Sequence, residues 1–520
     1  MKELNIEPRD YQKAIFETCK DKDCLVILPT GTGKTLIALM MAVERFKKFP
    51  LEKIVILAPT RPLIEQHFES FKKSLPEGWA DMQLFTGKTP ANKRKEIWQT
   101  AEFIFSTPQC ISNDLEKRLY DLSDVCLLVV DECHRCLKNY AYNKVCQKYK
   151  DQSNSPRVLG LTASPGSDKQ TITKVCENLG IEAVEIRTTE SSDVKPYLQE
   201  LEFEKIEVAF PIEFEEIKVL LSEIMNDKIQ NLRNLKVIFG YASKTMLLKT
   251  QSRLMDELKR NKDKNKMFAV SACAQALKIS HALELLETQT LSSFIIYLKD
   301  LYTQANEKKS KGVQRLTKDP RFAKAYTLAT TLNIEHPKLE RLKEVVSTQF
   351  IKEPNSRIII FAQFRETVRK ISELMNKIKG VKATIFVGQA IKNPNEASRT
   401  GLNQKEQKEI VEKFRSGEIN VLVATSIAEE GLDIPEVNEV IFYEPVPSAI
   451  RSIQRRGRTA RLSKGSLKIL VTKNTRDEIY HYVARNKERR MHTAIDQIKK
   501  DLDKGMSLNS EKETKQKRLF

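Results

Sequence analysis

Short apolar runs alternate with longer amphipathic stretches over the first part of the chain. The runs are CLVIL (24–28), KIVILA (53–58), FIFS (103–106), VCLLVVD (125–131) and RVLGLT (157–162). Runs without polar alternation are typical of strands buried on both faces of a sheet, and each is followed by a stretch with helical spacing. This order predicts a doubly wound parallel sheet, which we place in a first α/β domain at residues 1–200.

The same pattern returns in the second half of the chain. Its apolar runs are RIIIF (357–361), ATIFV (383–387), NVLVAT (420–425), EVIFYE (439–444) and SLKILV (466–471). These runs predict a second α/β domain at residues 336–490. Two separate arrays in one chain indicate two similar domains in tandem.

Residues 201–335, between the two arrays, contain no such runs. Lysine-rich pieces such as RNKDKNK (260–266) and NEKKSKG (306–312) are typical of exposed loops. We expect a helical insert, which is either a plain bundle or a basic arm that grips a ligand. Apolar residues recur here with the period of a helix, as in Leu283, Leu286, Phe294, Leu298 and Leu301.

The last residues, 491–520, are expected to form the end of a basic helix and then a disordered tail. The final segment QKRLF (516–520) faintly resembles the start of a peptide that docks on a sliding clamp. A solvated basic tail is the alternative interpretation.

The chain carries 88 basic and 69 acidic side chains, which gives a formal net charge of +19. Such a surplus favours a polyanionic partner, because lysine and arginine replace the counterions around phosphates. A merely soluble basic surface is the alternative. No stretch approaches the run of about 20 apolar residues that crosses a bilayer, and the N-terminus has no apolar signal core. We expect a cytoplasmic protein with no membrane partner.

The first apolar run leads directly into PTGTGKT (29–35) and then into a helical stretch. A glycine-rich turn between a strand and a helix leaves backbone N–H groups free to wrap a phosphate. We expect Lys34 to reach the β- and γ-phosphates of ATP, and Thr35 to hold Mg²⁺. The rest of the turn is expected to surround the phosphates: Pro29, Thr30, Gly31, Thr32 and Gly33.

A second motif of the expected ATP site, this one acidic, lies in VCLLVVDECH (125–134). Asp131, at the end of the predicted strand, is expected to bind Mg²⁺ through water. Glu132 is expected to orient and deprotonate the attacking water. His134 is either a structural histidine or a third polar group that couples hydrolysis to motion.

The next strand end is LTASPG (161–166). Thr162 and Ser164 are small hydroxyl residues at the point where a loop would bridge the ATP site and the surface that faces nucleic acid. We expect them to couple the two.

The second array contains QRRGRTARL (454–462). Gln454, Arg458 and Arg461 share one face of a predicted helix. Such a cluster is either a solvated or phosphate-binding helix face, or a set of arginine fingers that stabilise the charge of phosphoryl transfer. Its place late in a second α/β domain favours arginine fingers, and we assign all three residues to catalysis.

VATSIAEEGLDIP (423–435) precedes this cluster. Gly431 and Asp433 are expected where a loop meets the ribose of ATP. Thr425 is expected where the chain meets a nucleic-acid backbone.

Together these motifs resemble those of superfamily 2 helicases, with PRDYQ (8–12), APTRPL (58–63), STPQ (106–109) and FAQFRET (361–367) in the same order. Longer matches are similar to the Hef/FANCM/XPF group of fork-remodelling proteins. These are NYAY (139–142), HALELLETQ (281–289), FVGQA (386–390) and YEPVPSAIRSIQRRGRTAR (443–461). The resemblance covers about residues 1–490.

The resemblance implies two tandem RecA-like domains with the ATP site between them. It implies an ATP-dependent DNA helicase or translocase that acts on forked or branched DNA during repair, in an archaeal, nucleoid-associated setting. The insert would act as a thumb on branched duplex. Arg9 and Gln12 would recognise adenine. The DNA backbone would be contacted by Arg61, Thr86, Thr107, Gln109 and Arg365.

Two departures from the group's pattern leave alternatives open. Many members have DEAH where this chain has DECH, a spelling shared with RNA helicases of the RIG-I and Dicer types. A duplex-RNA-activated ATPase is therefore the alternative enzyme, although such proteins carry a C-terminal zinc domain and this chain has no cysteine after 273. A non-hydrolysing scaffold is a third reading. The nuclease motif ERK-x-x-x-D is not found, so nuclease activity is not expected.

Overall fold

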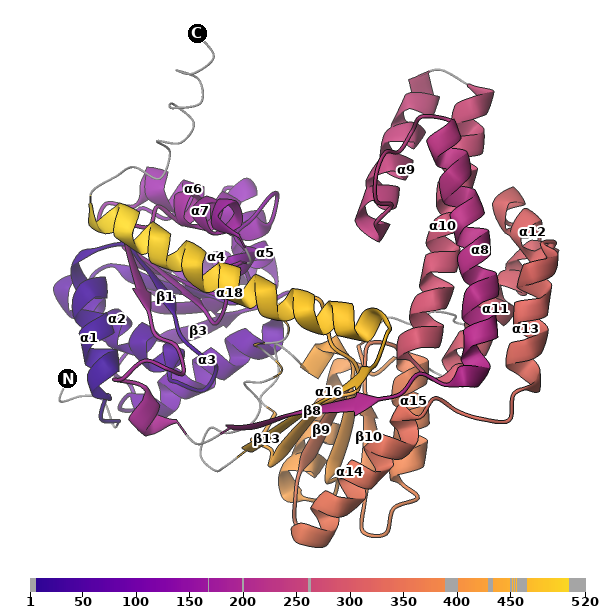
Figure 1. Ribbon diagram of the computed structural model, residues 1–520. Helices are drawn as coiled ribbons and strands as arrows, with labels where there is room; N and C mark the ends of the chain where they lie inside the picture. The colour runs from indigo at the N-terminus through magenta and orange to yellow at the C-terminus, as the bar shows by residue number, and fades with distance from the viewer. Residues whose placement is uncertain are drawn as a thin grey trace.

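A computed structural model describes residues 6–166, 168–198, 201–260, 263–388, 401–428, 434–448, 451, 453, 455 and 465–504. Two parallel sheets, each flanked by helices, are separated along the chain by a group of long helices (Figure 1). The fold class predicted from the sequence, two RecA-like α/β domains with a helical insert, is confirmed.

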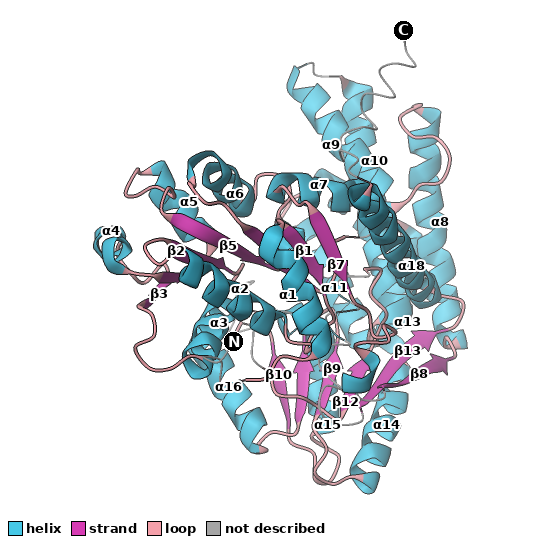
Figure 2. Ribbon diagram, turned by 90° about the vertical axis from the view of Figure 1, so that its left-hand side faces the viewer, coloured by secondary structure: helices cyan, strands magenta, loops and turns pink. Residues whose placement is uncertain are grey.

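The first domain contains a sheet whose described strands run in the order β3-β4-β2-β5-β6-β1-β7. Helices cover both faces of this sheet (Figure 2). Successive residues of the central strand point into two different cores, with Leu128 and Val130 in one and Leu127 and Val129 in the other. Burial on both faces is the reason why these strands read as continuous apolar runs.

The strands of this domain are β1 (Cys24–Ile27), β2 (Lys53–Leu57), β3 (Met82–Phe85), β4 (Phe103–Ser106), β5 (Val125–Asp131), β6 (Val158–Thr162) and β7 (Ala183–Ile186). The helices are α1 (Asp10–Asp21), α2 (Lys34–Lys48), α3 (Arg61–Ser74), α4 (Ala91–Thr100), α5 (Pro108–Glu116), α6 (Ala141–Gln152) and α7 (Lys169–Leu179), with short turns η1 (Cys133–Arg135) and η2 (Lys195–Tyr197). The strands β3 and β7 were not anticipated. Both are edge strands and only partly buried, so they lack a continuous apolar run.

The second domain contains a sheet in the order β10-β11-β9-β12-β13-β8. Its strands are β8 (Leu201–Val208), β9 (Ile358–Phe361), β10 (Ala383–Phe386), β11 (Val421–Ala424), β12 (Glu439–Phe442) and β13 (Gly465–Thr472). The described helices are α14 (Lys338–Lys352), α15 (Arg365–Met375) and α16 (Gln404–Ser416), with the turn η3 (Ser426–Ala428).

The strand β8 departs from the predicted division of the chain. Residues 201–208 were assigned to the insert, but they pair with β13 along its whole length, from Leu201 opposite Gly465 to Val208 opposite Thr472. Charged residues alternate along this exposed edge strand, so its sequence carries no apolar run.

The insert consists of helices between β8 and α14. They are α8 (Ile212–Asn234), α9 (Lys244–Arg260), α10 (Lys264–Thr288), α11 (Leu291–Asn306), α12 (Lys311–Thr317) and α13 (Pro320–Thr331). One apolar cluster joins α8 and α10 to α11, α12 and α13, and a second joins α9 to the far ends of α8 and α10. The insert therefore forms an arm that projects from the second domain (Figure 1).

A final long helix, α18 (Arg476–Asp503), connects the parts of the molecule. It begins beside the second sheet and crosses to the first domain (Figures 1 and 2). Met491, Ile495 and Ile498 of α18 are buried in the core of the first domain. Among the described residues, no helix is both long and apolar enough to cross a membrane.

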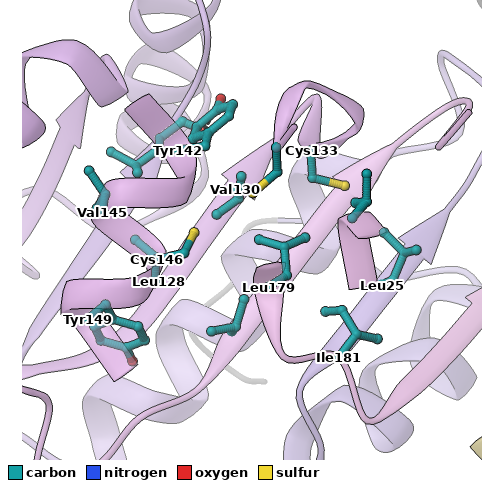
Figure 3. Close-up of a cluster of buried hydrophobic side chains, with 14 of the residues drawn as sticks. Leu25, Leu128, Val130, Cys133, Tyr142, Val145, Cys146, Tyr149, Leu179 and Ile181 are labelled. Carbon is teal, nitrogen blue, oxygen red and sulfur yellow. Dashed lines mark hydrogen bonds between the residues drawn. The ribbon is translucent and has the colours of Figure 1, made fainter. Parts of the chain in front are cut away.

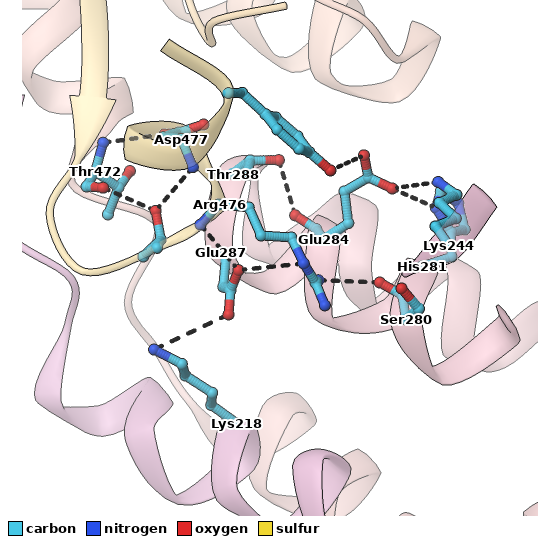
Figure 4. A network of polar contacts seen from close by, with 12 residues as sticks. Lys218, Lys244, Ser280, His281, Glu284, Glu287, Thr288, Thr472, Arg476 and Asp477 are labelled. Atoms are coloured by element: carbon cyan, nitrogen blue, oxygen red, sulfur yellow. Dashed lines mark hydrogen bonds and ion pairs between the residues drawn. The ribbon is translucent and has the colours of Figure 1, made fainter. Parts of the chain in front are cut away.

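The start of α18 is also tied to the insert through a polar network (Figure 4). The Arg476 guanidinium donates to the carbonyl of Ser280 at 3.0 Å, and its backbone N–H donates to Glu287 Oε2 at 3.2 Å. Tyr480 Oη donates to Glu284 Oε1 at 3.1 Å. Because Ser280, Glu284 and Glu287 all lie on α10, one side of that helix is fixed to α18.

Candidate ATP site and nucleic-acid-facing edge

The predicted ATP-site motifs meet at one edge of the first sheet. PTGTGKT follows β1, DECH follows β5 and TAS follows β6, and these three strands are neighbours in the order β5-β6-β1. Ile27 lies opposite Thr162, and Asp131 lies opposite Leu161. Carboxyl ends of parallel strands share one edge, where α/β proteins bind their ligands.

The glycine-rich turn enters α2 through Gly33, whose φ of 83° lies in the left-handed region. A Cβ at this position would collide with the side-chain amide of Gln12, so only glycine fits without a shift. The Lys34 ammonium donates to the carbonyls of Leu28 at 3.0 Å and Pro29 at 3.3 Å. Lys34 and Thr35 begin the helix, where unsatisfied N–H groups and the dipole suit a phosphate. These donors fit the phosphates of a nucleoside triphosphate, and the Thr35 hydroxyl is an oxygen ligand of the kind that Mg²⁺ takes.

Two side chains from the N-terminal segment, Tyr11 and Gln12, hold the glycine-rich turn in place. Tyr11 Oη donates to the carbonyl of Thr32 at 2.6 Å, and Gln12 Nε2 donates to the same carbonyl at 3.0 Å. Gln12 Oε1 in turn accepts from the backbone N–H of Arg9 at 2.9 Å. The Arg9 guanidinium lies over the ring of Tyr197, 4.9 Å from its centroid. Tyr11 and Tyr197 are site residues that the sequence reasoning missed.

The Asp131 carboxylate is buried and is oriented by a histidine from a different element. His67 Nε2, on α3, lies 2.9 Å from Asp131 Oδ2, and both side chains are almost fully buried. Burial raises the pKa of Asp131, but His67 and then Lys34 outweigh it, so the pKa is lowered from its usual value. Asp131 is therefore held as a carboxylate, the form that binds Mg²⁺. His67 lies outside every motif and was missed.

Glu132 and His134 lie together just beyond the strand. Glu132 has a φ of 48°, which is uncommon for a residue with a side chain. His134 Nδ1 lies 3.2 Å from Glu132 Oε2 and 3.2 Å from Thr162 Oγ1. The left-handed backbone of Glu132 is strained for a residue with a side chain, and strain of this kind clusters at functional sites.

A chain of contacts continues from His134 to the C-terminal helix α18, which packs on the first domain. Thr162 Oγ1 accepts from the backbone N–H of Ser164 at 3.1 Å. Ser164 Oγ donates to the sulfur of Met491, on α18, at 2.9 Å. The two predicted coupling residues thus connect the DECH segment to α18, a connection that the sequence reasoning did not foresee.

Cys133, which stands in the DECH motif where many members of the group have alanine, is buried in an apolar cluster (Figure 3). A Cβ at Gly160 would lie only 3.3 Å from its sulfur. Burial raises the pKa of the Cys133 thiol well above its usual value, so it stays protonated. The structure gives Cys133 a packing role.

Candidate nucleic-acid residues of the first domain follow the other strands of the sheet. Arg61, Thr86 and Thr107 come after β2, β3 and β4, which form the half of the sheet away from β1. Gln109 is exposed on α5, whereas Thr86 is largely buried, and its hydroxyl accepts from the backbone N–H of Lys88 at 3.3 Å. Arg61 Nε donates to Glu65 Oε1 at 2.6 Å.

The second domain has the corresponding arrangement. Arg365 follows β9 and donates to the carbonyl of Gly388, after β10, at 2.9 Å. Thr425 follows β11, and its backbone N–H donates to the carbonyl of Phe386 at 3.1 Å. The strands β10, β11 and β9 are neighbours, so these residues lie at one end of the second sheet.

A bridge between the two domains passes close to Arg61. Lys408 Nζ, on α16, donates to Glu65 Oε2 at 2.8 Å. Burial raises the pKa of Glu65, but the hydrogen bonds from Lys408 and Arg61 outweigh it and lower the pKa. Glu65 and Lys408 were missed, because no local pattern marks a pair from separate domains.

Five of the predicted site residues lie outside the described part of the chain. They are Gly431, Asp433, Gln454, Arg458 and Arg461. The QKRLF segment lies outside it as well.

Comparison with known families matches three consecutive parts of the chain. Residues 9–172 match the DEAD/DEAH box helicase family, and residues 337–463 match the helicase conserved C-terminal domain. Residues 213–336 match a helical bundle described for ATP-dependent RNA helicases.

Similar proteins include helicases named for both nucleic acids. The chain is 39% identical over 493 residues to the ATP-dependent RNA helicase MJ1505 of Methanocaldococcus jannaschii, covering 94% of this chain and 61% of that protein. It is 34% identical over 495 residues to the ATP-dependent DNA helicase mph1 of Neurospora crassa, covering 92% and 42%. It is 31% identical over 521 residues to the Fanconi anemia group M protein homolog of Mus musculus, covering 93% and 26%. The chain thus spans less than two thirds of the length of these relatives.

One solved structure matches along almost its whole length. The crystal structure of the Pyrococcus furiosus Hef helicase domain is 42% identical in sequence, with a TM-score of 0.69. The match covers 92% of this chain and 98% of that one. The chain therefore belongs to the Hef family of DEAD/DEAH box helicases.

Proposed function

We propose that this chain is an ATP-dependent DNA helicase or translocase that acts on forked or branched DNA, in the remodelling of replication forks and Holliday junctions during repair. The observation that carries the proposal is the division of the first sheet's edge. One half carries the phosphate-binding turn, Asp131 and Glu132, and the other half carries Arg61 and Thr107. A motor needs both halves, because hydrolysis at one must be coupled to a grip at the other.

At the ATP half, each side chain has a distinct role in this proposal. Lys34 binds the β- and γ-phosphates, and Thr35 and Asp131 hold Mg²⁺, the second through water. Bound Mg²⁺ would neutralise the charge that develops on the phosphate oxygens. Glu132 orients the attacking water and accepts its proton, with His134 beside it.

Residues that approach the nucleotide from other segments complete the proposed site. Arg9 and Gln12 recognise adenine while they hold the glycine-rich turn. Gly431 and Asp433 meet the ribose. The proposed arginine fingers, which act across the domain interface as in other phosphoryl-transfer enzymes, are Arg458 and Arg461, with Gln454 beside them.

At the nucleic-acid half, the proposed contacts are to the backbone. Arg61, Thr107, Gln109, Arg365 and Thr425 offer guanidinium, hydroxyl and amide groups, which bind phosphates without reading bases. Thr86 belongs to the same set, although its burial favours a contact through the loop that it supports. The insert acts as a thumb on branched duplex. A protein that binds chromosomal forks would be found with the nucleoid. For the C-terminal segment QKRLF, a solvated basic tail is favoured over contact with a sliding clamp.

The proposal is tested by measuring ATP hydrolysis with Mg²⁺, with and without a synthetic DNA fork. Glu132→Gln is expected to lower turnover by a factor of about 10²–10⁴, because it removes the general base, while ATP binding is retained. Glu96→Gln, on the exposed face of α4, is the matched control and should hydrolyse ATP normally. Full activity of Glu132→Gln, or hydrolysis indifferent to DNA, would overturn the proposal.

The DECH spelling favours one competing enzyme, a duplex-RNA-activated ATPase. Duplex RNA is therefore added as a second activator in the same assay. Strong activation by RNA together with none by the DNA fork would assign the motor to RNA.

A further inference from the structure

The loop 235–243, between α8 and α9 on the arm, exposes two aromatic side chains. Phe239 is 73% exposed and Tyr241 is 87% exposed. Gly240, between them, has a φ of 69°, and a Cβ added there would meet no atom within 4 Å. Two large aromatic side chains exposed within three residues form an apolar patch of the kind that marks interaction sites, which points to a ligand.

The loop is held in this form by its neighbours. Arg233 Nη2 donates to the carbonyl of Gly240 at 3.1 Å, and Arg253 Nη2 donates to the carbonyl of Val237 at 3.2 Å. Ile238 and Ala242 are buried in the apolar cluster that joins α9 to α8 and α10. Two buried side chains thus flank the three exposed residues of the loop tip, and the rings are presented by a preorganised backbone.

The sequence around the loop is basic, although two of its cations pair with carboxylates from outside it, Lys244 with Glu284 at 2.8 Å and Arg253 with Glu257 at 3.9 Å. The segment from Lys228 to Met255 contains no aspartate or glutamate, although acidic residues lie immediately outside it at Asp227 and Asp256. Figure 1 shows α9 on the side of α10 that faces the first domain. The basic residues of this segment are Lys228, Arg233, Lys236, Lys244, Lys249 and Arg253.

We propose that Phe239 and Tyr241 form a stacking platform for unpaired bases next to the branch point of a DNA fork. This inference rests on the proposed function and assigns to the insert a contact with bases. Aromatic faces stack on any base, and the surrounding lysines and arginines attract the phosphates between the bases. Because this segment carries six basic residues and no acidic one, its charge complements a nucleic-acid backbone, and the exposed rings complement the bases.

The test uses the full chain with both aromatics changed, Phe239→Ala with Tyr241→Ala. The probes are a fork with 2-aminopurine in the unpaired arm beside the junction, and a blunt duplex of the same sequence. Loss of stacking on one base should weaken fork binding about tenfold and remove the fluorescence change of 2-aminopurine, while duplex binding is unchanged. Phe239→Trp with Tyr241→Phe should retain both signals. Ile351→Ala, an exposed apolar residue on α14, is the matched control.

The outcomes separate this inference from the proposed function. If the wild-type chain binds the fork and the double alanine variant binds it equally well, the platform is wrong and the motor reading stands. If the variant loses fork and duplex binding to the same extent, the loop contributes general affinity and the platform is wrong. If the wild-type chain binds neither the fork nor the duplex, the proposed function is wrong, and the stacking platform that rests on it is wrong as well.

Discussion

At the scale of single residues, the candidate ATP site depends on side chains that carry no motif. The Asp131 carboxylate is positioned by His67, and the glycine-rich turn is positioned by Tyr11 and Gln12. The first contact fixes the carboxylate that would hold Mg²⁺, and the other two fix the backbone of the turn that would bind phosphate. A residue that orients a metal-binding carboxylate is expected to matter nearly as much as the carboxylate itself.

His67→Ala is therefore expected to weaken Mg²⁺ binding. Loss of the contact to Asp131 Oδ2 leaves the carboxylate free to rotate, and removing an outer partner of this kind costs about 10–100-fold in metal affinity. The measurement is the Mg²⁺ concentration that gives half-maximal ATPase activity, together with the binding of Mn²⁺ followed by electron paramagnetic resonance.

His492→Ala, on α18, is the control for His67→Ala and should leave the Mg²⁺ requirement unchanged. An unaltered Mg²⁺ requirement in His67→Ala would mean that Asp131 is oriented by the strand alone. The role of His67 would then be limited to packing.

At the scale of elements, the junction of α10, α14 and α18 rests on a fully buried ion pair. Lys338, at the start of α14, pairs with Asp477, at the start of α18, and neither side chain is exposed to solvent. Lys338 Nζ also donates to the carbonyl of Thr288, at the end of α10, at 3.1 Å. One ammonium group thus joins the insert to the second domain.

Lys338→Met is expected to destabilise the second domain by about 3–5 kcal/mol, because it leaves the Asp477 charge buried without a partner. Urea denaturation followed by circular dichroism measures the loss. Adding Asp477→Leu should restore much of the stability, since a buried pair can be replaced by apolar side chains. If the double variant is no more stable than Lys338→Met, the defect arises from packing and not from the charge.

The same variant should show a defined pH dependence. Burial raises the pKa of Asp477 even with Lys338 present. The folded state then binds more protons than the unfolded state, so stability falls as the pH rises from about 4 through the folded pKa. Removing Lys338 raises that pKa further, and the stability lost in Lys338→Met should be larger at pH 8 than at pH 5. Equal losses at both pH values would contradict this account.

At the scale of the whole molecule, α18 ties the first domain to the second domain and the insert. Its apolar side chains lie in the core of the first domain, whereas Arg476 and Tyr480 contact the insert. Ser164 touches this helix through Met491, so the loop beside the ATP site is in contact with an element that reaches the arm. Movement between the domains must therefore be accommodated by α18.

Met491→Leu is expected to weaken coupling and to preserve the fold. The change conserves volume and should cost less than about 1.5 kcal/mol of stability, but it removes the acceptor for Ser164 Oγ. We expect the stimulation of ATP hydrolysis by a DNA fork to fall by an amount equivalent to about 0.5–2 kcal/mol of coupling, with the DNA-free rate unchanged. Ile498→Val, in the same core, is the control, and an equal effect of both variants would assign the change to packing.

Much of this architecture was predictable from local sequence. The central strands are apolar because they are buried on both faces, and the glycine-rich turn needs Gly33 at a positive φ. The edge strands β3, β7 and β8 were missed because edge strands are not buried on both faces. They are exposed on one side, so no continuous apolar run marks them.

The sequence by itself determined the two α/β domains, the helical insert and the chemical groups of the candidate site, because these follow from short-range periodicity and from motifs a few residues long. Only the tertiary structure decided which distant residues meet. His67 and Asp131 are 64 positions apart, Ser164 and Met491 are 327 apart, and Glu65 and Lys408 are 343 apart. Contacts over such separations depend on how sheets and helices pack, and packing is a property of the folded chain as a whole.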